Sequence, residues 1–346
     1  MEVRFAVADV PGFGAGRLDL FLSRRIKGST RSGVQKLIVD GRVRVDGRAG
    51  EARASTRVAE TDAVVVRYPR REDPPPKVER LAVLHEDEAL LVVDKPAGVL
   101  SHPTDKVARN SVTAILAEQR PGTRLFLAHR LDRETSGVLV LTKDPVSARR
   151  LQEQFERRET EKEYLALVRG RPAWTETVVD LPLAKAGGAV KVRQAGTEDG
   201  APAVTAFRVE AAGEDAALVS CRPKTGRLHQ LRVHLAHLGH PILGDLLYGG
   251  GDELYLKAVA GTITEEDRAA AGALRQMLHA QRLRFQHPGT GAVVDVTAPV
   301  SEDFTLLAGR CGLTVSLRLS TKEILSGDST AAGPFDVWGS QGPRTL

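Results

Sequence analysis

Residues 129–137 read His129-Arg130-Leu131-Asp132-Arg133-Glu134-Thr135-Ser136-Gly137. This polar segment lies between two apolar runs, 90–93 and 137–141, which have the composition of buried strands. It carries one carboxylate, Asp132, with an arginine on either side. Loops held by a rigid scaffold often carry catalytic groups, and nearby positive charge keeps an aspartate ionised, as a nucleophile requires. The same spacing also fits a structural ion pair, so both interpretations stand at this point.

Strands and helices alternate irregularly around this segment. Asp144 and Pro145 predict the start of a helix, because a carboxylate N-cap followed by proline favours the first helical turn. Residues 164–168 have a strand pattern, and a further helix is predicted up to Gly239, with Leu228, Leu231, Leu235 and Leu238 on one face. The irregular order favours an α+β fold with a mixed or antiparallel central sheet over a regular βαβ fold.

A second polar cluster spans residues 224–234, Lys224-Thr225-Gly226-Arg227-Leu228-His229-Gln230-Leu231-Arg232-Val233-His234. Gly226 permits a tight turn into the helix. Arg227 is then expected in the first turn, where a guanidinium can pair with a carboxylate or a phosphate through two parallel bonds. A basic helix that only covers surface is the alternative.

Metal and disulfide chemistry are not expected. Cys221 and Cys311 are the only cysteines and form no C-x-x-C pair. His234, His237 and His240 share a broad helical face, but Gly239 and Pro241 interrupt that helix and no nearby acid or cysteine completes a ligand set. We therefore expect no metal and no cofactor.

Residues 17–67 form a small, strongly basic module. Helices are predicted near 18–22 and 32–38, and strands at 42–45 and 63–66. Between 17 and 48 the chain has nine basic and three acidic residues, a net charge of +6 that exceeds the +5 of the whole chain. A solvated charged face is the ordinary explanation, but this density favours phosphate binding. The candidate contacts are Arg31, Lys36, Arg42 and Arg44.

These patterns divide the chain into four parts. We predict the basic module over 1–68, with 1–16 as a glycine-containing lead-in loop, and a proline-rich linker over 69–80. A catalytic domain is predicted over 81–308 and a poorly ordered tail over 309–346. No apolar run approaches the roughly 20 residues of a membrane span, and the N-terminus lacks a signal-peptide pattern, so we expect a cytoplasmic protein.

The residues at 129–143, H-R-L-D-R-E-T-S-G-V-L-V-L-T-K, closely resemble the signature of the RluA family of pseudouridine synthases. The resemblance continues in the family's order through most of 81–307, at 94–98, 162–170, 224–234, 239–245 and 278–280. Residues 17–67 resemble the S4-like RNA-binding domain that often precedes this catalytic domain. Two departures are Asp46, where asparagine is usual, and Leu228, where threonine or serine is usual and which we expect to pack on the apolar stripe.

The resemblance implies roles for individual residues. Asp132 matches the catalytic aspartate and would act as nucleophile at the sugar C1′ or at the base. Arg227 would pair with Asp132, and Tyr164 would stack on the target base and help the closing proton transfer. Arg130 matches the residue that fills the space of the extruded base. His129, Lys95 and Thr135 are further substrate-binding candidates from the same motifs.

The function implied is the isomerisation of specific uridines in RNA to pseudouridine. Large-subunit ribosomal RNA is favoured, because the S4-like domain usually accompanies that substrate, and transfer RNA is the alternative. A non-catalytic RNA-binding or ribosome-assembly factor is a second class, and a hydrolytic glycosidase is a third, with Glu134 as its second carboxylate. We expect a monomer acting on naked RNA or on a pre-ribosomal particle.

Overall fold

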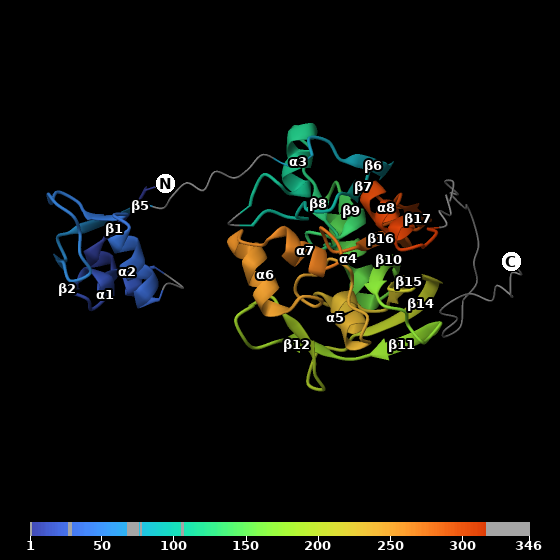
Figure 1. Ribbon diagram of the computed structural model, residues 1–346. Coiled ribbons are helices and arrows are strands. Elements are labelled where there is room, and N and C mark those ends of the chain that lie inside the picture. The colour runs from blue at the N-terminus through green and yellow to red at the C-terminus, as the bar shows by residue number, and fades with distance from the viewer. Residues whose placement is uncertain (1, 27–29, 68–75, 77, 105–106, 316–346) are drawn as a thin grey trace, which may run out of the picture. The chain divides into compact units, whose positions relative to one another are not determined.

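The computed structural model describes residues 2–26, 30–67, 76, 78–104 and 107–315. The chain divides into two compact units, Met1–Glu72 and Asp73–Leu346, and Figure 1 draws both. Most of the predicted linker at 69–80 and of the predicted tail lies outside the described residues.

The N-terminal unit packs two helices against small sheets. Helices α1 (Leu18–Arg25) and α2 (Arg31–Val39) cover a three-stranded antiparallel sheet of order β1 (Glu2–Ala6), β5 (Ala63–Arg67), β3 (Val43–Val45). Phe21, Val34 and Val64 are fully buried in the core between them. The helices and strands predicted within 17–67 are therefore confirmed.

The lead-in prediction for residues 1–16 is wrong in part. Strand β1 pairs with β5 along its whole length, from Glu2 opposite Arg67 to Ala6 opposite Ala63. A second pair joins β2 (Ala15–Arg17) to β4 (Arg57–Ala59), and a single 3-10 turn, η1 (Val7–Asp9), lies between the two strands. These residues become strands because later segments of the chain supply hydrogen-bonding edges for them.

The C-terminal unit is built on a ten-stranded sheet (Figure 1). The main path runs β11-β14-β15-β10-β16-β9-β7-β6, with β17 beside β16 and β8 beside β9. Of these pairings only β9 with β16 is parallel, so the predicted mixed, mainly antiparallel sheet is confirmed. The strands are β6 (Ala82–Glu86), β7 (Leu90–Lys95), β8 (Phe126–Leu127), β9 (Ser136–Thr142), β10 (Glu161–Arg169), β11 (Glu176–Asp180), β14 (Val204–Ala212), β15 (Ala216–Pro223), β16 (Leu278–Gln286) and β17 (Val293–Thr297), and a separate small pair joins β12 (Leu183–Lys185) to β13 (Gln194–Gly196).

Six helices of the described C-terminal unit accompany the sheet: α3 (Val112–Gln119), α4 (Pro145–Arg157), α5 (Gln230–His237), α6 (Gly251–Ala260), α7 (Glu265–Ala270) and α8 (Glu302–Arg310). Helix α4 begins as predicted, with the Asp144 carboxylate accepting from the amides of Val146 and Ser147 at 2.9 and 2.8 Å. No helix in the described part of the chain is long and apolar enough to cross a membrane.

The poorly ordered tail predicted from residue 309 starts too early. Helix α8 continues to Arg310, and the Leu313 side chain is only 4% exposed. Leu313 packs in the same core cluster as Phe304 and Leu218. Burial of this leucine holds residues up to 315 against the sheet, and 316–346 lie outside the described residues.

Helix α5 begins three residues later than expected. His229 immediately precedes the helix and has a left-handed backbone, with φ of +58°, so the preceding residues cannot continue the helical turn. Leu228 therefore lies outside the helix and is 52% exposed. The prediction that Leu228 packs on the apolar stripe is wrong; Leu231 and Leu235 form the buried part of that stripe.

Candidate active site

Asp132 lies in the loop between β8 and β9, and neighbouring segments hold this loop through its backbone. The Leu131 amide donates to Ser101 Oγ at 3.0 Å, and Ser101 Oγ donates back to the Leu131 carbonyl at 2.9 Å. The Gly98 amide donates to the carbonyl of Arg133 at 2.8 Å. These bonds tie the residues on both sides of Asp132 to the segment after β7.

Lys95, the last residue of β7, also holds this loop in place. Its side chain is fully buried, and Nζ donates to the carbonyl oxygens of Pro96, Val99 and Arg133 at 3.0, 2.7 and 3.0 Å. Burial lowers the pKa of Lys95 to about 7, against the opposing effect of nearby acids. The expected substrate-binding role of Lys95 does not fit this position, because an RNA cannot reach an amino group enclosed by three carbonyls.

Arg232 forms the ion pair with Asp132 that the family resemblance implied for Arg227. Its Nη1 donates to Asp132 Oδ2 at 3.1 Å, while Nε and Nη2 donate to the two carboxylate oxygens of Asp245 at 2.6 and 2.9 Å. Burial favours the neutral form of Asp245, but the hydrogen bonds and charge of Arg232 outweigh it and lower the pKa of Asp245. The buried Asp245 carboxylate thus holds the Nε and Nη2 edge of the guanidinium, and Nη1 faces Asp132.

The predicted pairing of Arg227 with Asp132 is wrong. Arg227 is exposed, and its Nε donates to the carbonyl of Pro202 at 3.2 Å. Because α5 starts at Gln230, Arg227 lies in the loop before the helix, and Arg232 takes the position in the first turns of the helix that faces Asp132. Arg227 still lines the pocket described next, so a role toward substrate stays a prediction.

A pocket of about 120 Å³ opens beside Asp132 and is called the base pocket below. The charged, aromatic and polar residues that line it are Asp132, Arg130, Thr135, Lys162, Tyr164, Thr225, Arg227, His229, Gln230 and Arg232. Tyr164 enters from β10 where its register against β16 shifts, between Glu163 and Tyr164, a device that re-aims side chains beside active sites. Burial, and then the charge of Asp132, raise the pKa of Tyr164, so its phenol is neutral.

Two of the predicted substrate-binding residues have structural contacts. Thr135 is only 2% exposed and accepts from Gln276 Nε2 at 3.2 Å, although it also forms part of the pocket wall. His129 Nε2 accepts from the Val140 amide at 3.2 Å, and its ring lies 4.9 Å from that of Phe155. Burial lowers the pKa of His129 to about 3, so the ring is neutral and holds the start of the loop to β9. Arg130, by contrast, is exposed at the pocket edge.

His229 and Tyr248 belong to the site but were not singled out from the sequence. His229 Nδ1 and the Tyr248 hydroxyl lie 2.9 Å apart, and His229 Nε2 lies 3.9 Å from Asp132 Oδ2. Burial and the charge of Arg232 lower the pKa of His229 to about 4, so it is neutral beside Asp132. The left-handed backbone of His229, rare outside glycine, marks it as a constrained position.

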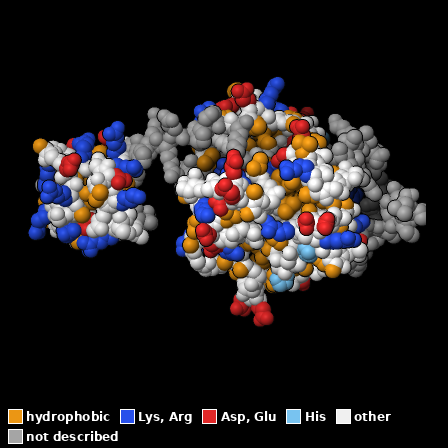
Figure 2. Space-filling view, in the orientation of Figure 1, with side chains coloured by type: hydrophobic (Ala, Val, Ile, Leu, Met, Phe, Trp, Pro, Cys, Tyr) orange, Lys and Arg blue, Asp and Glu red, His pale blue; other side chains and the backbone are white. Residues whose placement is uncertain are grey.

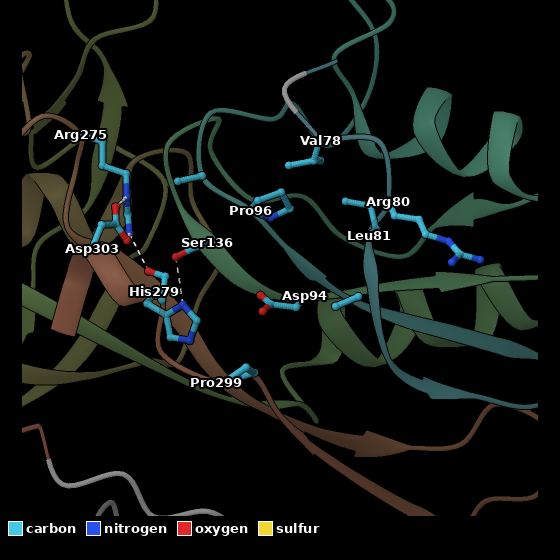
Figure 3. A pocket seen from close by; sticks show the side chains of 13 residues that line it. Val78, Arg80, Leu81, Asp94, Pro96, Ser136, Arg275, His279, Pro299 and Asp303 are labelled. Carbon is cyan, nitrogen blue, oxygen red and sulfur yellow. Dashed lines mark hydrogen bonds and ion pairs between the residues drawn. The ribbon is translucent and has the colours of Figure 1, made fainter. Parts of the chain in front are cut away.

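A separate cavity of about 410 Å³ is lined by residues that include Asp94, Pro96, Ser136, Arg275 and His279 (Figure 3). There Ser136 Oγ and His279 Nδ1 lie 3.0 Å apart, and burial raises the pKa of Asp94 to about 6. Arg275 spans this region: it donates to Asp303 Oδ1 at 2.9 Å and to the carbonyl of Glu134 at 3.4 Å. Asp132 does not line this cavity. We therefore interpret the residues around the cavity as a support for the loop that carries Asp132.

The predicted absence of a metal site leaves three histidines to place. His234 is fully buried and makes contacts with Thr205 Oγ1 and the Leu181 carbonyl, His237 is exposed, and His240 contacts the Arg169 carbonyl. Within the described residues, no group of three histidine, cysteine or acidic side chains is arranged to hold a metal ion.

The candidate phosphate-binding residues of the N-terminal unit differ in whether they already form ion pairs within the protein. Arg31 pairs with the buried carboxylate of Asp19 at 3.0 Å, Arg44 with Asp46 at 2.8 Å, and Arg42 more loosely with Asp40 at 3.6 Å. Lys36 is exposed on α2. Figure 2 shows Lys and Arg side chains spread over the visible face of this unit.

The chain matches two family models. Residues 89–237 match the RNA pseudouridylate synthase model, and residues 16–64 match the S4 domain model. The first range contains Asp132, Tyr164 and Arg232, and the second contains all four candidate phosphate contacts.

Full-length relatives agree with these matches. Ribosomal large subunit pseudouridine synthase C of Yersinia pestis is 35% identical over 317 residues, covering 86% of this chain and 93% of the relative. Synthase D of Xanthomonas campestris pv. campestris is 36% identical over 305 residues, covering 87% and 90%. The solved structure of human RNA pseudouridylate synthase domain containing 4 superposes with a TM-score of 0.54 at 31% identity, over 68% of this chain and 94% of that one. The chain belongs to the RNA pseudouridylate synthase family, and it carries an S4 domain on its N-terminal side.

Proposed function

We propose that this enzyme converts specific uridines of large-subunit ribosomal RNA to pseudouridine, with Asp132 as the nucleophile. The observation that carries the proposal is the Asp132 carboxylate, which lines the base pocket together with Tyr164 and is paired with Arg232 at 3.1 Å. The choice of RNA follows the relatives, which are named as ribosomal large subunit synthases.

The reaction replaces the N1–C1′ bond of the uridine by a C5–C1′ bond. Asp132 forms a transient bond at C1′ or at the base, and the N1–C1′ bond breaks with its electron pair passing to the base. The base turns within the pocket, C5 bonds to C1′ and the bond to Asp132 breaks, so that the carboxylate is restored; C5 loses its proton and N1 gains one. Arg232 holds the carboxylate in position, since its own orientation is fixed by Asp245. Tyr164 provides the surface on which the extruded base stacks, a contact of about 1–3 kcal/mol.

The S4 domain is proposed to dock the RNA through Arg31, Lys36, Arg42 and Arg44. Such contacts to phosphates bind many sequences alike, so they add affinity, while the base pocket selects the uridine. We further propose that the enzyme acts as a monomer in the cytoplasm, on naked RNA or on an assembling particle.

The test is pseudouridine formation in unmodified large-subunit ribosomal RNA, mapped by carbodiimide adducts and reverse transcription, with Asp132→Asn as the matched inactive variant. A stop that wild type produces and the variant does not establishes the reaction, the nucleophile and the site. A transfer RNA pool and an unmodified large-subunit particle are tested in parallel. A stop in transfer RNA alone would mean that transfer RNA, and not ribosomal RNA, is the substrate. The absence of a stop in all three substrates would contradict the proposal.

A further inference from the structure

Lys162 is a cation in the base pocket that the proposed mechanism leaves unused. It lies at the start of β10, two residues before Tyr164, and both side chains line the pocket with Asp132. Its Nζ donates to the carbonyl of Thr225 at 3.2 Å. An ammonium group has three donors, so Lys162 retains donors for a ligand in the pocket.

The surroundings of Lys162 are unfavourable for a charge. Burial, and then the charge of Arg158 at the end of α4, lower the pKa of Lys162 to about 8. Among the described residues no carboxylate forms an ion pair with its Nζ, which donates to the Thr225 carbonyl. A partly buried cation without an acidic partner costs stability, and side chains held in this way in a cleft often act on a ligand.

We propose that Lys162 is a further catalytic residue, whose ammonium group donates a hydrogen bond to a carbonyl oxygen of the target uracil as the N1–C1′ bond breaks. The electron pair of that bond passes to the base, where the negative charge spreads to the carbonyl oxygens. A fixed donor aimed at developing charge stabilises the transition state more than the bound uridine. Lys162 keeps its protons throughout: C5 loses its proton to water, N1 takes one from water, and the product is an isomer of the substrate.

Other titratable groups near the pocket bear on the pH dependence of this step. His129, at the start of the loop that carries Asp132, has a pKa of about 3, and His229, just before α5, has a pKa of about 4, so both stay neutral. The pKa of Tyr164 is raised. Asp132, Arg130, Arg227 and Arg232 also face the pocket. Lys95, with a pKa of about 7, lies beneath the loop and outside the pocket lining. A loss of activity above pH 8 therefore needs a variant to assign it to Lys162.

The experiment measures single-turnover rate constants and RNA affinity between pH 6 and 9.5 for wild type, Lys162→Met, Lys162→Arg and Lys191→Met. Lys162→Met removes the charge at nearly constant length and is expected to slow the reaction about 10²–10³-fold, the usual effect of losing one such donor, with little change in affinity. Lys162→Arg keeps a charge at every pH in this range. It is expected to retain part of the rate and to lose the decline near pH 8. Lys191→Met makes the same change on an exposed lysine outside the pocket lining and is expected to leave the rate constant unchanged.

Three results would overturn the proposal: a Lys162→Met rate within about threefold of wild type, a loss confined to RNA affinity, or a decline near pH 8 that persists in Lys162→Arg. Circular dichroism of Lys162→Met checks the fold, and the Lys162→Arg profile decides the question if Lys162→Met does not fold. The inference rests on the uridine isomerisation itself. The wild-type rate reports on that activity, and the ratio of variant to wild type reports on Lys162, so the two failures are distinguishable.

Discussion

Arg232 Nη1 donates to Asp132 Oδ2 at 3.1 Å across 100 residues of sequence, and the opposite edge of the same guanidinium is bound to the buried Asp245. One side chain thus connects the loop that carries Asp132 to α5 and to the segment after it. The position of the Asp132 carboxylate therefore depends on Arg232, and through Arg232 on Asp245.

Arg232→Lys is expected to lower kcat about 10²-fold with a smaller effect on RNA affinity. Lysine presents a single ammonium, which cannot bond both oxygens of Asp245 and reach Asp132 in the same geometry, and a displacement of about 1 Å at a reacting group costs that much. Arg227→Lys is the matched control and is expected to change KM more than kcat. The opposite ranking of the two variants would return the Asp132-pairing role to Arg227. Arg232→Ala is less informative, because leaving Asp245 buried and unpaired costs about 3–5 kcal/mol of stability.

Tyr164→Phe is expected to keep kcat within about tenfold of wild type, whereas Tyr164→Ala loses a further factor of about 5–150, the equivalent of about 1–3 kcal/mol of base stacking. The pKa of Tyr164 is raised, so its hydroxyl stays protonated and the ratio of Tyr164→Phe to wild type should not vary between pH 6 and 9. Equal losses in both variants would instead assign the hydroxyl a part in proton transfer, as the family resemblance implied.

Local patterns in the sequence were sufficient for several elements. The helix start at Asp144-Pro145 depends on two adjacent residues, and the structure has that cap. The strands around 129–137 follow from continuous apolar runs, which need no knowledge of their partners. The strand that follows the Asp132 loop was therefore predicted. Strand β8, the two-residue strand directly before the loop, was not, because so short a segment leaves no pattern.

The predictions from the sequence failed where the structure depends on contacts between distant parts of the chain. The late start of α5 depends on Gln230, whose side chain accepts from the Arg227 amide and donates to the Val204 carbonyl, about 25 residues earlier in the chain. Strand β1 exists because β5, some 60 residues later, pairs with it. Lys95 looked available for substrate because a lysine in a motif carries no sign of the three carbonyls that enclose it. A residue-by-residue pattern contains none of these partners.

Gly137→Ala is expected to destabilise the C-terminal unit by about 3 kcal/mol or more. Gly137 has φ of +110°, and a Cβ there would lie 2.2 Å from the carbonyl oxygen of Ala280, in the parallel pairing of β9 with β16. Gly122→Ala is the matched control: φ is +84°, but nothing lies within 4 Å of the added Cβ, so only about 1–2 kcal/mol of backbone strain is expected. Urea unfolding followed by circular dichroism measures both. Equal losses would mean that the strands can separate enough to admit a methyl group.

Lys36→Ala is expected to weaken RNA binding and to reduce the salt dependence of that binding, with no loss of stability. Lys36 is exposed on α2, and in the described part of the chain it forms no ion pair, so its charge is available to a phosphate. Removal of one phosphate contact should reduce the slope of log K against log salt by about 0.7–0.9. Arg31→Ala is the informative comparison, because Arg31 also pairs with Asp19, whose side chain is fully buried. It should lower both the salt slope and the melting temperature of the N-terminal unit. Fluorescence anisotropy of labelled RNA from 50 to 300 mM salt measures the slopes. Slopes that match wild type in both variants would mean that this face of α2 does not contact the RNA.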